Sequence, residues 1–199
     1  MKRFSVLILI SLFVMSVHAF DVQGLIGVGP GATFDSFNIV LNGKKTTKTI
    51  ITPNVKINTT ALLFPAASNY GFGFGVEGYS IFGDTAGFGG KISIGPSARF
   101  LFEDAPIGVL PSLFVNYEKS VDAHASSNMI NVGFETSVII STKINGRGLS
   151  TMVTIGYAPI NKAIASYGNY VFKPDLSNYG RMTLGAYIGS GNSVFSEKR

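Results

Sequence analysis

Six ionisable residues of this sequence have a spacing that places them in one enclosed space. Each occupies the polar position of a stretch in which apolar and polar residues alternate: Lys56, Glu77, Arg99, Glu118, Glu135 and Arg181. Successive side chains of a β-strand face opposite sides, so all six are expected on the face away from the apolar residues. An isolated buried carboxylate is too costly to stay ionised, and the three acids must therefore pair with the three bases. We expect Lys56 and Arg99 to flank Glu77 from neighbouring strands.

The elements that would hold these charges are eight alternating stretches. Each has one apolar face, and together they cover residues 22–34, 51–63, 70–76, 92–102, 109–117, 130–140, 149–157 and 182–188. Only 14% of the residues are charged, against roughly 25% in an ordinary soluble domain. The mean hydropathy is +0.32. These values indicate a sheet with hydrocarbon on one side, and such a sheet must close because an unpaired backbone group in lipid costs several kcal/mol.

The first residues predict export. Lys2 and Arg3 precede the apolar run 4–17, and Val17-His18-Ala19 has the small residues of a cleavage site, so we expect residues 1–19 to be a signal peptide and 20–199 to be one domain. No cysteine is present, which excludes disulfides and thiolate metal sites. The loss of Lys2 and Arg3 lowers the formal net charge from +5 to +3, too little to indicate nucleic acid.

The connections between the eight stretches alternate in length. Short, turn-rich links are expected at 64–69, 103–106 and 145–148. Longer or more polar links surround Lys44, Asp84 and His124, and the longest is 161–178. This alternation is typical of an up-and-down barrel whose two chain ends lie on the side of the short turns.

With a signal peptide, eight strands and alternating connections, the chain resembles the small outer-membrane β-barrels of the OmpA, OmpX and OmpW class. The resemblance implies an all-β, closed, eight-stranded antiparallel transmembrane barrel with short periplasmic turns and longer extracellular loops. It also implies a monomer in outer-membrane lipid with a lipopolysaccharide-type leaflet, inserted by the outer-membrane assembly machinery. The chain departs from that class at its end, where Phe195 precedes Ser196–Arg199 and lies on the parity opposite to Ile188. A bulge near Gly189 or Gly191 would repair the parity.

Two functions fit such a barrel. Neither function is catalytic, and neither needs a cofactor. The first is a narrow porin-like conduit for small or hydrophobic molecules, resembling OmpW, with the lumen charges as a gate. The second is a barrel plugged by those charges, whose loops serve adhesion, immune evasion or envelope integrity. Eight strands rarely leave an open pore, which favours the charges as packing. Exposed loop aromatics suggest contact with a host-surface ligand, and the candidate residues are His124, Tyr167, Tyr170 and Phe172. A soluble lipocalin-type barrel is the remaining alternative.

Two local patterns are weaker. His124 is the only histidine after residue 19, which leaves no histidine cluster for a metal. Asp122, Ser126 and Ser127 lie beside it, but sequence neighbours on a polar loop do not make a catalytic triad of the kind some outer-membrane lipid A hydrolases or acyltransferases use. Gly89-Gly90-Lys91 lacks the spacing of a phosphate-binding loop.

Overall fold

The structure is a computed structural model, and it describes residues 20–41, 44–66, 68–82, 86–102, 105–122, 124–144, 147–176 and 179–194. The expected signal peptide, 1–19, and the tail from Phe195 onward lie outside the described residues. Within the described ranges, no helix is long and apolar enough to cross a membrane.

Nearly all of the described chain is strand. The strands are β1 Phe20–Leu41, β2 Lys44–Pro65, β3 Tyr70–Ile81, β4 Ala86–Phe100, β5 Ile107–Val121, β6 Ala125–Ile144, β7 Arg147–Tyr167, β8 Tyr170–Phe172 and β9 Tyr179–Val194. Glycine, threonine and β-branched residues dominate these segments, and the alternation of apolar and polar residues fits the two faces of a pleated strand.

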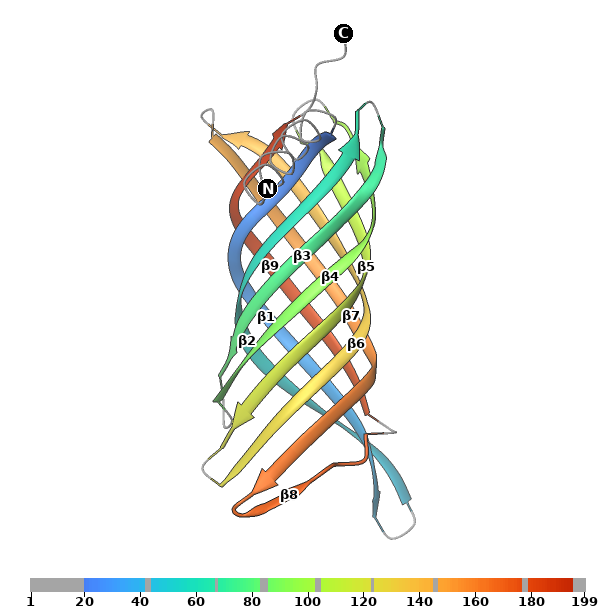
Figure 1. Ribbon diagram of the computed structural model, residues 1–199, viewed down its shortest axis with the longest axis vertical. Coiled ribbons are helices and arrows are strands. Elements are labelled where there is room, and N and C mark those ends of the chain that lie inside the picture. The colour runs from blue at the N-terminus through green and yellow to red at the C-terminus, as the bar shows by residue number, and fades with distance from the viewer. Residues whose placement is uncertain are drawn as a thin grey trace, which may run out of the picture.

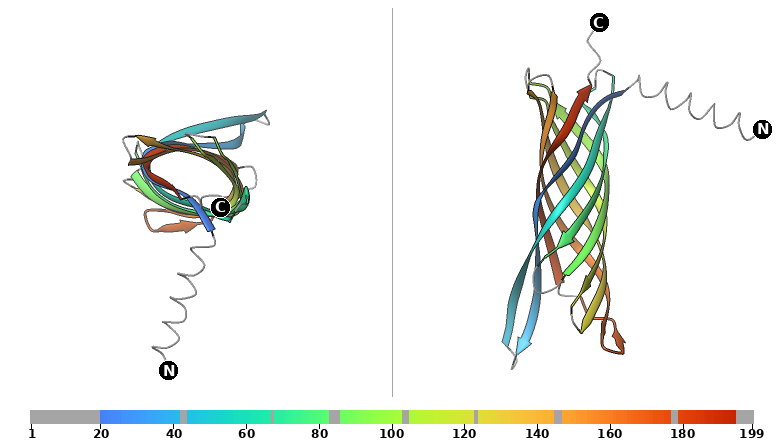
Figure 2. Two further views of the ribbon diagram at one scale, coloured as in Figure 1. Left: turned by 90° about the horizontal axis from the view of Figure 1, so that it is seen from above. Right: turned by 90° about the vertical axis from the view of Figure 1, so that its left-hand side faces the viewer.

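Eight of the strands close into a ring. Neighbours in the chain pair antiparallel from β1 to β7, and β9 pairs with both β7 and β1, which leaves no open edge within the ring. The short β8 lies outside the ring and pairs only with the end of β7. Figure 2 shows the closed cross-section from above. The fold class expected from the sequence is therefore confirmed.

The two ends of the barrel differ. At the turn end, β1 begins and β9 ends, and the connections around 66–69 and 101–106 are short. At the opposite end, which we call the ribbon end, β1 and β2 continue well past their neighbours as a two-stranded ribbon (Figure 1). β8 also lies at the ribbon end.

The ribbon end contains more strand than expected. The polar stretch around Lys44, expected as a loop, belongs to β2, which begins at that residue. Most of the stretch 161–178 is also strand, because β7 continues to Tyr167 and β8 pairs back onto it. Gly168 makes that reversal with a positive φ of 56°, a conformation that glycine adopts without a Cβ penalty.

The two faces of the wall have opposite chemistry. Outward side chains are apolar and exposed, as the expected parity requires: they include Ile26, Ile57, Phe72, Ile92, Leu113, Phe134, Val153 and Ile188. Inward side chains include nearly all the buried polar and charged residues, among them Lys56, Glu77, Arg99 and Arg181. The apolar faces expected from the sequence are thus the outside of the barrel.

One strand changes parity on the way. Val132 of β6 pairs with Ile160 of β7, whereas Phe134 pairs with Tyr157, so β7 has one extra residue at Ala158–Pro159. A bulge of this kind moves the following residues to the other face and accommodates a proline that cannot donate to the ladder. No such shift occurs in β9 up to Val194, where the pairing with β1 is in constant register. The bulge considered near Gly189 or Gly191 is therefore absent.

Candidate functional site

The lumen at the turn end is closed by polar side chains that cross it. The Arg99 guanidinium on β4 lies 2.6 Å from the Asp21 carboxylate on β1 and stacks over the Phe64 ring at 4.7 Å. Gln23 of β1 donates from Nε2 to the Pro106 carbonyl oxygen at 3.0 Å, on the far side of the ring. Strands that are not neighbours are joined in this way, and the contacts lie inside the barrel.

An apolar layer fills the lumen beside these polar contacts. Its members come from strands around most of the ring and are almost fully buried: Leu25, Leu62, Phe64, Leu110, Ile139, Met152 and Tyr187. Gly73 lies against this layer, since a Cβ there would come within 2.6 Å of Leu62 Cδ2 and 3.0 Å of Leu110 Cδ1. The alternating glycines of β3 thus leave room for side chains from other strands. The sequence analysis missed this layer, because inward positions were read as polar or small.

The central network is built around Glu77. Its carboxylate lies 3.2 Å from Lys56 Nζ on β2 and 3.2 Å from Lys91 Nζ on β4, and it accepts a hydrogen bond from the Tyr187 hydroxyl on β9. Lys91 Nζ also lies 2.5 Å from the Glu135 carboxylate on β6. All four charged side chains are buried, so each charge depends on these partners.

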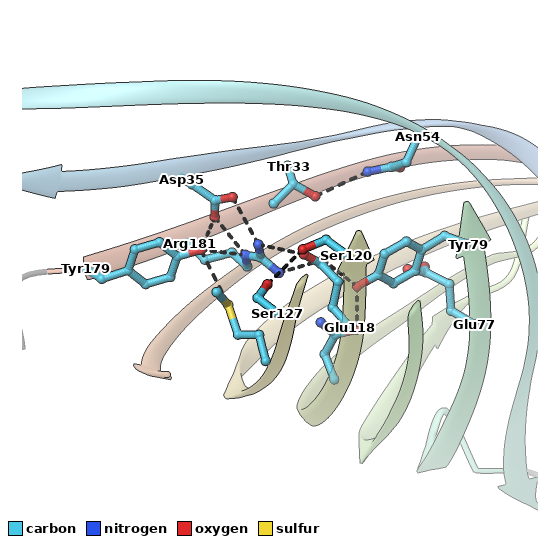
Figure 3. A network of polar contacts seen from close by, with 12 residues as sticks. Thr33, Asp35, Asn54, Glu77, Tyr79, Glu118, Ser120, Ser127, Tyr179 and Arg181 are labelled. Carbon is cyan, nitrogen blue, oxygen red and sulfur yellow. Dashed lines mark hydrogen bonds and ion pairs between the residues drawn. The ribbon is translucent and has the colours of Figure 1, made fainter. Parts of the chain in front are cut away.

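A third network lies toward the ribbon end (Figure 3). The Arg181 guanidinium is held between Asp35, whose Oδ1 is 2.7 Å from Nε, and Glu118, whose Oε2 is 2.7 Å from Nη1. Tyr79 donates to Glu118 Oε2 at 3.0 Å, and Tyr179 donates to Asp35. The three remaining charged residues expected in the lumen therefore all find partners: Glu118 pairs with Arg181, and Glu135 pairs with Lys91.

The prediction that Arg99 flanks Glu77 was wrong. Arg99 contacts Asp21 at the turn end, and the second base on Glu77 is Lys91. The register of the two strands explains the difference, because Glu77 pairs directly with Lys91, whereas Arg99 lies at the other end of β4, next to Ala98, which pairs with Tyr70 at the start of β3. Lys91 lies on the same face of β4 as Arg99, and this shared parity is the sequence feature that could have identified it as a lumen residue. Asp35 was missed because the first strand was expected to end at Phe34, whereas β1 continues to Leu41.

The Arg181 network forms the floor of a small cup. A cavity of about 240 Å³ lies beside it, lined also by Thr33, Ser120 and Met129. Both carboxylates that line it, Asp35 and Glu118, already bind Arg181, so the described residues of the cup leave no unpaired charge for a ligand.

The ribbon offers a different kind of surface. Pairing of β1 with β9 ends at Phe37, and pairing of β2 with β3 begins at Asn54, while β1 and β2 remain paired to Leu41 and Lys44. Among the described residues, stretch 44–52 of β2 therefore has a strand partner on one side only. Its residues from Thr46 to Ile51 are exposed, and all of them except Lys48 are β-branched.

The aromatic candidates gather where β7 turns into β8. Tyr167, Tyr170 and Phe172 are exposed, and the His124 ring lies edge-on to Tyr167 at 6.5 Å. Ser126 and Ser127, which follow His124, form hydrogen bonds with Ser166 and Ser120 on neighbouring strands, at 2.8 and 2.7 Å. These bonds hold the serines to adjacent strands, as in ordinary cross-strand pairs.

No protein-family model matches the chain, and no curated protein matches it. Solved structures with a similar fold include Neisserial surface protein A, at 13% identity over 86% of this chain and 96% of that one, with a TM-score of 0.41. Ail, the attachment invasion locus protein of Yersinia pestis, shows 10% identity over 85% and 98%, with a TM-score of 0.47. The outer membrane protease OmpT from Escherichia coli shows 10% over 87% and 96%, with a TM-score of 0.40. Likenesses this distant say nothing about binding or catalysis.

Proposed function

We propose that the mature chain, residues 20–199, is a non-enzymatic barrel of the bacterial outer membrane that is closed in its lumen and presents its ribbon end to partners outside the cell. The membrane location is supported by the apolar outer wall, where residues such as Ile92, Leu113 and Phe134 are more than half exposed. A soluble domain would face water with charges at such positions. A closed ring also satisfies every strand edge inside lipid.

The observation that carries the proposal is a contrast along the barrel axis. Side chains from non-neighbouring strands meet inside the ring at three levels. β1 and β2, in contrast, extend past the ring, where they pair with each other and enclose no lumen. The cross-lumen contacts favour the plugged barrel over the porin-like conduit, because a permeant molecule would have to separate buried ion pairs.

The ribbon suggests how a partner would be held. The unpaired side of 44–52 exposes backbone N–H and C=O groups, and an extended segment of another protein can add to such an edge as a further strand. Its β-branched residues favour a pleated conformation before the partner arrives. The exposed aromatic group Tyr167, Tyr170 and Phe172, with His124, would provide a second contact at the same end.

Attachment of bacteria to an epithelial monolayer tests this proposal. The test variant lacks residues 38–41 and 44–47 and keeps Asn42-Gly43 as the connection, so that Phe37 still pairs with Lys48 and the ring is unchanged. The matched control replaces Lys143, at the turn end, with glutamine. We expect the shortened ribbon to lose most of the attachment while the protein still fractionates with the outer membrane and migrates as a heat-modifiable band. Unchanged attachment by the shortened variant would contradict the proposal.

A further inference from the structure

A second hollow lies on the outside of the wall near the ribbon end. Its floor consists of outward side chains from three adjacent strands: Tyr117 of β5, Ile130 of β6, and Ile160 and Ile164 of β7. The segment 173–176, which connects β8 to β9, forms its other side. The volume is about 920 Å³, near the upper end of the ~300–1,000 Å³ typical of ligand pockets. Figure 2 shows that β8, which precedes this segment, stands outside the ring.

The bulge in β7 creates the floor of this groove. Before the bulge the outward residues of β7 have odd numbers, as at Val153 and Tyr157, and after Ala158–Pro159 they have even numbers. Ile160, Lys162 and Ile164 consequently face outward. Without the extra residue, Asn161 and Ala163 would take those positions, and the groove would lose the two isoleucines and the lysine that β7 supplies.

The charges of the groove are unequal. Lys162 and Lys173 line it, and both are exposed. Among the described residues that line it, Asp175 is the only acidic one, and it is already engaged in an interaction. The groove therefore combines an apolar floor with an excess of positive charge, a combination that suits an amphiphile with an anionic head.

The surroundings favour a lipid over a soluble ligand. The outward face of β6 remains apolar from Ile130 to Phe134, and that of β5 from Tyr117 to Val115. The floor of the groove is therefore continuous with the apolar outer wall. Tyr117 donates from its hydroxyl to Asn128 Oδ1 at 2.8 Å, an arrangement typical of the head-group level, where an aromatic ring meets lipid and its polar end meets water.

We propose that this groove binds a phosphorylated lipid of the surrounding outer leaflet, with acyl chains on Ile130, Ile160 and Ile164 and the phosphate at Lys162 and Lys173. The proposal rests on the membrane location given above. It assigns a lipid site on the outer wall that is independent of the ribbon and of the lumen.

Tryptophan fluorescence tests the site directly, because the chain contains no tryptophan. Ile164→Trp places a reporter on the floor, and Ile92→Trp places one on the exposed wall of β4, away from the groove. Both proteins are folded in detergent and titrated with phosphatidic acid that has brominated acyl chains, which quench tryptophan on contact. Phosphatidylcholine with the same chains is the control lipid.

We expect phosphatidic acid to quench the reporter at position 164 at concentrations that leave the reporter at 92 bright, and phosphatidylcholine to quench neither. Replacing Lys162 and Lys173 with glutamine should weaken the quenching about tenfold or more, because both positive charges that would contact the phosphate are lost. Lys48→Gln, on the ribbon, should leave it unchanged. Native mass spectrometry of the unsubstituted protein with the two lipids gives a reading that depends on no variant, and retention of phosphatidic acid alone is expected.

Equal quenching of both reporters, equal effects of the two lipids, or undiminished quenching in the lysine double variant would overturn the proposal. The proposal would also be overturned if the protein forms a dimer that lipid does not displace and that the substitution Ile164→Trp abolishes. The groove would then bind a second copy of the chain. A protein that shows no heat-modifiable band in detergent would count against the membrane location itself, whereas a folded barrel without lipid selectivity would count against the groove alone.

Discussion

The lumen and the ribbon are made from the same alternation, yet they place their polar side chains in opposite circumstances. Inside the ring, Glu77 meets partners from three other strands, and Arg181 is held between acids from two. On the ribbon, the hydrogen bonds of the Thr47 and Thr49 side chains among the described residues go to the one facing strand, at Asn38 and Ser36. Closure thus turns a sheet face into a packed interior, and strands that outrun the closure become surface with a free edge.

The largest expected effect comes from removing the hub of the lumen. Glu77→Ala leaves Lys56 and Lys91 buried with one fewer counter-charge, and the loss of a partner from a buried ion pair costs about 3–5 kcal/mol. The free energy of unfolding, measured by urea titration of the barrel in lipid vesicles, should fall by that amount. Lys48→Gln on the ribbon is the matched control and should change it by less than about 0.5 kcal/mol. A similar small effect for both variants would mean that the lumen is wet.

The apolar layer gives the next effect. Leu62 is fully buried inside the ring, and Leu62→Ala should lower the free energy of unfolding by about 2–5 kcal/mol through lost transfer energy and a cavity. Ile94→Ala on the outer wall is the control, where lipid can fill the space that the side chain leaves. A larger cost at Ile94 would show that the lumen side chains are loosely packed.

Gly73 sharpens the same point. Gly73→Ala would bring a Cβ to 2.6 Å from Leu62 Cδ2, and overpacking of this kind costs about 1–3 kcal/mol. The cost should shrink when Leu62→Ala is already present, because that substitution removes the nearest obstacle. A double-mutant cycle measures the coupling, and additive effects would contradict the described packing.

Shortening the ribbon should have the smallest effect on stability. Deletion of 38–41 and 44–47 removes four pairs between β1 and β2 and none between the ring's other strands. A two-stranded ribbon by itself is marginally stable at best in water, and the removed residues lie beyond the pairing with β9 and β3, so they add little to the free energy of unfolding. We expect an unchanged unfolding midpoint in the urea titration. A marked loss would show that the ribbon braces the barrel.

Much of the fold could be predicted from the sequence, because parity is a local property. The alternation at Phe72, Phe74 and Val76 fixes which side faces outward, and Glu77 then has to face inward. The sequence has few charges and no long apolar stretch for a membrane-spanning helix after residue 19, so the apolar outward faces are expected to meet lipid. A sheet in lipid must close into a barrel to pair all of its strand edges.

The partners of the charges could not be predicted in the same way. Height in a barrel depends on strand tilt and register, which are properties of the closed ring, so Arg99 was matched to Glu77 although it lies with Asp21. The bulge at Ala158–Pro159 and the reach of β1 to Leu41 also depend on pairing with other strands. The threonines and lysines near residue 46 were predicted to form a loop, because polar composition alone does not distinguish a loop from a solvent-exposed two-stranded ribbon.

Ion conductance of the folded, unsubstituted barrel in planar lipid bilayers tests the central claim most directly. The cross-lumen contacts of Arg99, Lys91 and Arg181 predict a barrel that inserts, as its heat-modifiable band would show, and passes no current. Discrete conductance steps from the unsubstituted protein, altered in size or selectivity by Glu77→Gln, would contradict the closed lumen and restore the conduit.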